Sequence, residues 1–168
     1  MDAHIVNPLD TSIVISVEQQ HLQLFNAGQL LRAYAISTAK NGVGQENGSG
    51  CTPAGKHSIR AKVGAGSPMG AVFVGRRSTG EVFSTELADH YPNRDWILTR
   101  ILWLTGREHG VNRCGSVDTL RRYIYIHGCP DTAAMGAPAS HGCIRMRNVD
   151  VLDLFDRVNV GTTVQIEF

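Results

Sequence analysis

The sequence predicts a mainly β protein of antiparallel or mixed strands with a short helix packed on them. Apolar and polar residues alternate in short N-terminal segments, beginning with Ile13, Ile15 and Val17, and this is the period of a half-buried strand. The clearest helical spacing of apolar residues lies near the C-terminus, at residues 148–158. Strands and helices therefore do not alternate regularly, which argues against a parallel α/β sheet.

The N-terminal third predicts a meander of strands joined by polar turns. A second alternating segment, residues 21–24, leads through a turn at 26–28 to a further strand at 30–38. Residues 40–50 are mostly Gly, Asn and Ser. We expect this loop either to be mobile on the surface or to close over a site.

The middle of the chain contains less regular strand signals. Runs typical of strands occupy residues 71–74, 97–104 and 123–126. Ser116 is placed to cap a short helical turn that continues through Arg121.

One amphipathic helix and a last strand complete the prediction. Asn148 is expected as the helix N-cap, and the apolar residues that follow have the i, i+3, i+4, i+7 spacing of a packed helix. These residues are Val151, Leu154, Phe155 and Val158. Gly161 should end the helix before a final strand at residues 163–168.

Length and composition indicate an ordinary globular chain. With 168 residues, it is expected to form a single domain spanning residues 1–168. Hydrophobic residues make up 42% and charged residues 18%, which excludes a disordered tail or a coiled coil as the main body. The formal net charge is +1 without runs of Lys or Arg, so we expect no nucleic-acid partner.

The N-terminus and the cysteines favour the cytoplasm. Residues 1–10 carry an acid where a signal peptide has a basic start. The apolar run at 96–104 is interrupted by Arg100 and is too short to span a bilayer. The four cysteines form no zinc-ribbon pairs, and free thiols suit a reducing compartment. A periplasmic location is the alternative if the natural chain extends before Met1.

The segment from Tyr123 to Met146, YIYIHGCPDTAAMGAPASHGCIRM, carries the candidate chemistry. A strand ending at His127 and Gly128 is followed by a Gly/Pro loop that has to turn back and bring Cys143 close to His127. An imidazole that takes the proton of a thiol leaves a nucleophilic thiolate, and the two charges stabilise each other. Amides around Gly142 and Cys143 can point at a developing oxyanion, and a carbonyl near Gly128 can orient the base.

This pattern closely resembles the signature of the L,D-transpeptidase catalytic domain (YkuD type). The resemblance lies in the His-Gly at the end of a strand, the short Gly/Pro loop and the run Ser140-His141-Gly142-Cys143-Ile144-Arg145-Met146. Residues 52–59, Thr-Pro-Ala-Gly-Lys-His-Ser-Ile, also look like the Thr-Pro-x-Gly hairpin of that family. The resemblance covers nearly the whole chain and implies a β-sandwich whose site opens between His127 and Cys143.

The resemblance also implies roles for the site residues. Cys143 corresponds to the acyl-accepting nucleophile, His127 to its base and Gly128 to the residue whose carbonyl orients that base. The expected oxyanion and substrate-binding residues are Ser140, His141, Gly142 and Arg145. His141 can instead only shape the loop, and Arg145 can be a structural ion-pair partner rather than a carboxylate anchor. Many family members have Thr where this chain has Cys129.

The implied reaction is acyl transfer through a thioester on a peptidoglycan tetrapeptide or muropeptide, without a cofactor. The bond cut joins the L-centre of the diamino acid to the terminal D-alanine. A cytoplasmic chain would meet soluble muropeptides, so we expect water as the acceptor, as in an L,D-carboxypeptidase that trims or recycles muropeptides. The alternative is an L,D-transpeptidase that forms cross-links or exchanges D-amino acids.

The sequence also offers three rival interpretations. His127, Cys129, His141 and Cys143 form two His-x-Cys pairs, which would suit a structural zinc site. Residues 50–57 approach a phosphate-binding loop, but His57 replaces its hydroxyl residue and Pro53 removes an amide donor. A catalytically dead cell-wall-binding module would not need the intact Cys143 and His127.

Overall fold

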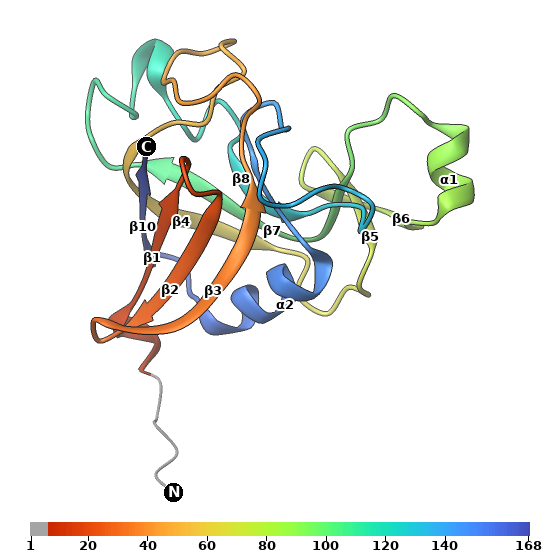
Figure 1. Cartoon of the computed structure of the whole chain (residues 1–168), viewed down its shortest axis with the longest axis horizontal. Helices are drawn as coiled ribbons and strands as arrows, with labels where there is room; N and C mark the ends of the chain where they lie inside the picture. The colour runs from red at the N-terminus through yellow and green to blue at the C-terminus, as the bar shows by residue number, and fades with distance from the viewer. Residues whose placement is uncertain (1–6) are drawn as a thin grey trace, which may run out of the picture.

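The computed structural model describes residues 7–168 and shows one mixed β-sheet with two short α-helices (Figure 1). The expectation about a leader rests on residues 1–10, of which residues 1–6 lie outside the described part. The elements are η1 (Pro8–Asp10), β1 (Thr11–Ser16), β2 (His21–Asn26), β3 (Gln29–Ser37), β4 (Gly55–Val63), β5 (Ala71–Val74), β6 (Arg77–Val82), α1 (Thr85–His90), β7 (Ile97–Gly106), η2 (Gly115–Val117), β8 (Tyr125–Gly128), β9 (Ile144–Met146), α2 (Asn148–Arg157) and β10 (Thr163–Glu167).

The sheet closes on itself. Its strand order is β4-β10-β1-β2-β3-β9-β8-β7, and a further pairing of β4 with β7 joins the two ends. The pairs β1–β10 and β8–β9 are parallel, whereas the other pairs are antiparallel. The predicted mixed β class with short helices is confirmed, but the strands form a closed sheet rather than the two stacked sheets of a sandwich. Because β4 pairs with β10 on one side and with β7 on the other, this closed sheet of eight strands has no free edge.

The predicted N-terminal meander is confirmed. Buried and partly exposed residues alternate along β1, with Ile13 and Ile15 inside, as the period of two requires. The turn between β2 and β3 has Ala27 and Gly28 at φ 47° and 77°, the backbone of a tight hairpin turn that matches strand twist.

The helix α2 packs its apolar face on the main core and contacts β7 and β8. Its buried side chains include Val151, Leu154 and Phe155, as the helical spacing predicted. Asn148 is not the N-cap; that position belongs to Arg147, and Asn148 is a buried first helical residue. Among residues 7–168, no helix combines the length and apolarity needed to cross a bilayer.

The side chain of Asn148 explains this difference, because it makes tertiary contacts instead of capping. Thr99 Oγ1 donates to Asn148 Oδ1 at 2.6 Å, while Asn148 Nδ2 donates to the carbonyl of Cys129 at 2.9 Å and to Asp131 at 3.2 Å. The start of α2 is thereby tied to β7 and to the end of β8.

Four elements in the middle of the chain differ from the prediction. The strand expected at residues 123–126 is β8, which begins two residues later, because Tyr123 has φ 56° and lies in a turn. The strand β6 and the helix α1 had no clear sequence signal, since β6 is largely exposed and α1 has no buried residue. Near Ser116, η2 has no side-chain cap; Asp118 instead accepts from the amide of Arg121 at 3.0 Å.

The loop at residues 40–50 is held against the rest of the chain by Arg122. Its guanidinium donates to the carbonyls of Gly44 and Gln45 at 3.1 Å and of Cys51 at 2.6 Å. Thr52, at the end of this segment, donates to the carbonyl of Gly142 at 2.9 Å. These contacts anchor the loop to the rest of the chain, while the cavity around Cys143 is lined by residues outside 40–50.

Replacing Asn148 by alanine should lower the free energy of unfolding by about 1–3 kcal/mol, because buried partners lose their hydrogen bonds. Urea unfolding followed by circular dichroism measures this. Val149→Ala is the matched control, since Val149 is 59% exposed on the same helical turn. Equal stability of the two variants would contradict the structural role of Asn148.

Candidate active site

The parallel pairing of β8 with β9 brings the two candidate segments together. The register places Ile126 beside Ile144 and His127 beside Arg145. Cys143 directly precedes β9, and side chains two residues apart point to the same face of a sheet. His127 therefore lies diagonally across from Cys143, although the two residues are far apart in sequence.

The returning loop is anchored on the end of β3. The amides of Ala139 and Ser140 both donate to the carbonyl of Thr38 at 2.9 Å, and Ser37 Oγ donates to the carbonyl of Ala137 at 2.7 Å. The Gly/Pro composition predicted a loop that turns back, and these contacts fix where it does so.

A cavity of about 510 Å³ opens at this point of the sheet. Five of the site residues predicted from the sequence line it: Cys143, His127, Ser140, His141 and Arg145. Gly128 takes part through its carbonyl, and Gly142 is buried in the turn before Cys143. The wall also contains residues that the sequence did not single out for the site, including Asp95 and Arg76.

His127 is 1% exposed and held by one short contact. Its Nδ1 lies 2.7 Å from the carbonyl oxygen of Gly128, so an N–H at Nδ1 donates there and Nε2 is left for proton transfer. Burial lowers the pKa of His127 below its ordinary value of 6.5, and the Gly128 carbonyl opposes this shift. A Cβ at Gly128 would lie 2.6 Å from the carbonyl oxygen of Leu98, so only glycine fits here.

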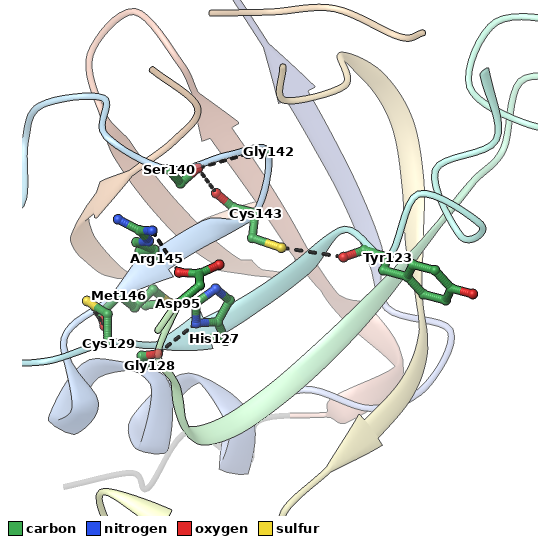
Figure 2. Close-up of polar contacts among 10 residues, drawn as sticks. All are labelled: Asp95, Tyr123, His127, Gly128, Cys129, Ser140, Gly142, Cys143, Arg145 and Met146. Carbon is green, nitrogen blue, oxygen red and sulfur yellow. Dashed lines mark hydrogen bonds and ion pairs between the residues drawn. The ribbon is translucent and has the colours of Figure 1, made fainter. Parts of the chain in front are cut away.

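The thiol of Cys143 contacts the backbone at the start of β8. It donates to the carbonyl of Tyr123 at 3.4 Å and accepts from the amide of Tyr125 at 3.4 Å. Figure 2 shows the sulfur pointing toward Tyr123 rather than toward the ring of His127. Burial raises the pKa of the Cys143 thiol to about 11. The resting site thus favours a neutral thiol and a neutral imidazole over the ion pair described from the sequence.

The turn before Cys143 is internally bonded (Figure 2). Ser140 Oγ donates to the carbonyl of Cys143 at 2.5 Å and accepts from the amide of Gly142 at 3.2 Å. The Gly142 amide is therefore already occupied, whereas the amide of Cys143 has no acceptor within residues 7–168. Gly142 has φ 137°, and a Cβ there would lie 3.1 Å from Ile124, so glycine is required.

Arg145 pairs with Asp95 across the cavity wall. Its Nη2 lies 3.0 Å from Asp95 Oδ1, which is the ion-pair alternative considered from the sequence. Asp95 sits just before β7 in a polar segment without a distinctive pattern, so no sequence signal marked it. His141 is exposed at the cavity wall.

Cys129 does not join the thiol of Cys143. It is 2% exposed and donates to the carbonyl of Met146 at 3.3 Å, apart from Cys143 in Figure 2. Burial raises the pKa of the Cys129 thiol to about 11. In the described part of the chain no three His, Cys, Asp or Glu side chains converge as a metal site, so the geometry gives the zinc interpretation no support.

The fold and the cavity define a mainly β protein with a cysteine and a histidine facing one pocket. The family model of the L,D-transpeptidase catalytic domain (YkuD) matches residues 10–166. The chain belongs to this family.

Individual relatives are similar over different lengths. The probable L,D-transpeptidase YbiS of Escherichia coli K12 is 48% identical over 44 residues, which are 26% of this chain and 14% of that protein. L,D-transpeptidase 3 from Mycobacterium tuberculosis superposes with a TM-score of 0.59 at 16% identity, covering 95% of this chain and 61% of the other. LdtMt1 in complex with imipenem gives a TM-score of 0.57 at 18% identity, covering 94% and 59%. At these identities the solved structures support the fold alone.

Alkylation of Cys143 should depend steeply on pH. A thiol with a pKa near 11 is almost fully protonated at neutral pH, so its rate with iodoacetamide should rise about tenfold per pH unit between about pH 7 and pH 10. Peptide mapping by mass spectrometry measures each cysteine separately, and the exposed Cys114 serves as the internal comparison. A rate that is already constant at neutral pH would show a thiolate at rest.

Proposed function

We propose that this chain is a cysteine acyltransferase acting on peptidoglycan stem tetrapeptides. The observation that carries the proposal is the shared cavity of Cys143 and His127 in a chain that matches the L,D-transpeptidase family over residues 10–166. The substrate class follows from the family. The bond to be cut joins the L-centre of the diamino acid to the terminal D-alanine.

The first half of the reaction forms a thioester. The Cys143 side chain first turns away from the Tyr123 carbonyl. His127 Nε2 then takes its proton as the sulfur attacks the scissile carbonyl carbon, so the charges arise only during attack. The free amide of Cys143 is the candidate donor to the oxyanion. The imidazolium then gives its proton to the leaving amine of D-alanine as the carbon–nitrogen bond breaks.

The second half returns the enzyme to its resting state. His127 accepts a proton from the incoming acceptor while the acceptor oxygen or nitrogen attacks the thioester carbonyl. The carbon–sulfur bond breaks, and the sulfur recovers its proton from the imidazolium. The contact of Nδ1 with the Gly128 carbonyl fixes the ring tautomer, so Nε2 is the nitrogen that exchanges the proton in both halves.

We propose water as the acceptor, which makes the chain an L,D-carboxypeptidase. Cys143 is only partly buried at the wall of the cavity, so water can reach a thioester formed on it. A cytoplasmic location and a role in muropeptide recycling remain predictions, to be tested by cell fractionation and by analysis of muropeptide pools in a deletion strain.

One observation favours the cross-linking alternative. A second hollow of about 240 Å³ lies on the other side of the Asp95–Arg145 pair and is lined by Arg94, Trp96 and Cys129, among others. An acceptor amine could approach from this hollow while a donor peptide fills the first cavity.

Cys143→Ala should lower turnover of a free tetrapeptide by at least about 1,000-fold, and His127→Ala by about 100- to 10,000-fold. Imipenem should form a covalent adduct on Cys143, as read by intact-mass analysis, and none on the Cys143→Ala protein. Cys114→Ser, which alters an exposed thiol outside the cavity, is the control for both assays. Full turnover or an unchanged adduct without Cys143 would reject the nucleophile.

Product analysis separates the two acceptors. With tetrapeptide alone and with an added D-amino acid or amine acceptor, the tripeptide should dominate, because water reaches the thioester. Mass spectrometry distinguishes the tripeptide from an exchange product or dimer. Exchange products or dimers in excess over tripeptide would replace the carboxypeptidase by the transpeptidase.

A further inference from the structure

Arg76 places a positive charge in the cavity that no residue of the described chain neutralises. It lies in the turn that joins β5 to β6 and lines the same cavity as Cys143 and His127. Of the two arginines that line this cavity, Arg145 is paired with Asp95 at 3.0 Å. For Arg76, no carboxylate lies within ion-pair distance among residues 7–168.

Three aromatic side chains hold the guanidinium in place. Its Nη1 donates to the hydroxyl of Tyr125 at 2.8 Å. Its Cζ lies 4.5 Å from the ring centroid of Trp103 and 4.9 Å from that of Tyr123, within the range of cation–π contacts. Burial raises the pKa of the Tyr125 hydroxyl, so this partner stays neutral and leaves the charge of Arg76 uncompensated.

The backbone at this turn is unusual for an arginine. Gly75 and Arg76 have φ 54° and 66°, and Val74 pairs with Arg77 across the turn. A tight hairpin turn of this type favours Gly or Asn at both central positions. The chain instead carries a long cationic side chain there, folded back over the aromatic rings at the cavity.

A fixed planar guanidinium with free N–H groups matches a carboxylate, which it can bind through two parallel hydrogen bonds. We propose that Arg76 binds a carboxylate of the stem peptide and thereby determines substrate specificity. This proposal rests on the proposed function. The tetrapeptide offers two such groups near the scissile bond: the terminal carboxylate of D-alanine and the carboxylate carried by the side chain of some diamino acids.

Arg76 is a better candidate than Arg145 for binding a substrate carboxylate, because Arg145 is already paired with a carboxylate of the protein. Arg145 already shares its guanidinium with Asp95, so a substrate carboxylate there would meet a negative neighbour. Arg76 has no such neighbour, and its attachment to Trp103, Tyr123 and Tyr125 limits the rotamer freedom that binding would otherwise remove.

The test uses Arg76→Gln and Arg76→Lys, with Arg77→Gln as the matched control, because Arg77 is exposed and lies outside the cavity. The substrates are a tetrapeptide with both free carboxylates, the same peptide ending in D-alaninamide, and the same peptide with an amidated diamino acid. Turnover is measured for each protein with each of the three peptides. Binding to Cys143→Ala proteins that carry or lack Arg76 is measured by calorimetry, so the readout does not depend on catalysis.

For the peptide with free carboxylates, Arg76→Gln should weaken binding and raise KM about 10- to 100-fold, with a smaller effect for Arg76→Lys and none for Arg77→Gln. The loss should disappear for the amide that lacks the bound carboxylate, which identifies the group. The proposal would be overturned if Arg76→Gln weakened binding of all three peptides equally or of none. It would also be overturned if no peptide bound to the Cys143→Ala protein. Absence of turnover by the unmodified protein, with binding still dependent on Arg76, would instead reject the proposed reaction. Thermal unfolding of each variant controls for folding.

Discussion

The parallel pairing of β8 with β9 is the constraint on which the site depends. These strands are only four and three residues long, and their register alone decides that Cys143 lies diagonally opposite His127. A slip by one residue would turn one of the two side chains to the other face of the sheet. The neighbours β3 and β7 pair with β9 and β8, so the closed sheet fixes this register from both sides.

Burial sets the protonation states of His127 and Cys143 in the resting site. The imidazole is almost fully buried and the thiol is partly buried, and burial shifts each toward its neutral form. Arg145 is balanced by Asp95, which leaves Arg76 as the uncompensated charge among the cavity residues discussed above. An anionic group on a ligand would meet one dominant attraction, at the β5–β6 turn, rather than a diffuse positive field.

The sequence predicted those features that local patterns determine. Alternation of apolar residues marked β1 and β2, helical spacing marked α2, and the Gly/Pro loop between His127 and Cys143 indicated that the two would meet. Closure of the sheet was not predictable, because β4 pairs with β7 through residues 38 to 49 positions apart that carry no sequence signal for this pairing. Asp95, Arg76 and the tertiary contacts of Asn148 were missed for the same reason. The role of each residue depends on partners that are distant in sequence and close only in the folded structure.

The hairpin of β5 and β6 stands outside the closed sheet (Figure 1). Within residues 7–168, its only strand pairing with the closed sheet is with β7, where Val72 pairs with Leu98 and Phe73 with Ile97. A substitution in its turn therefore removes no backbone pairing of β8 or β9, although Arg76 contacts the Tyr125 side chain of β8. Under the proposed role of Arg76, evolution can change the ligand preference at the β5–β6 turn while the register that aligns Cys143 with His127 stays the same.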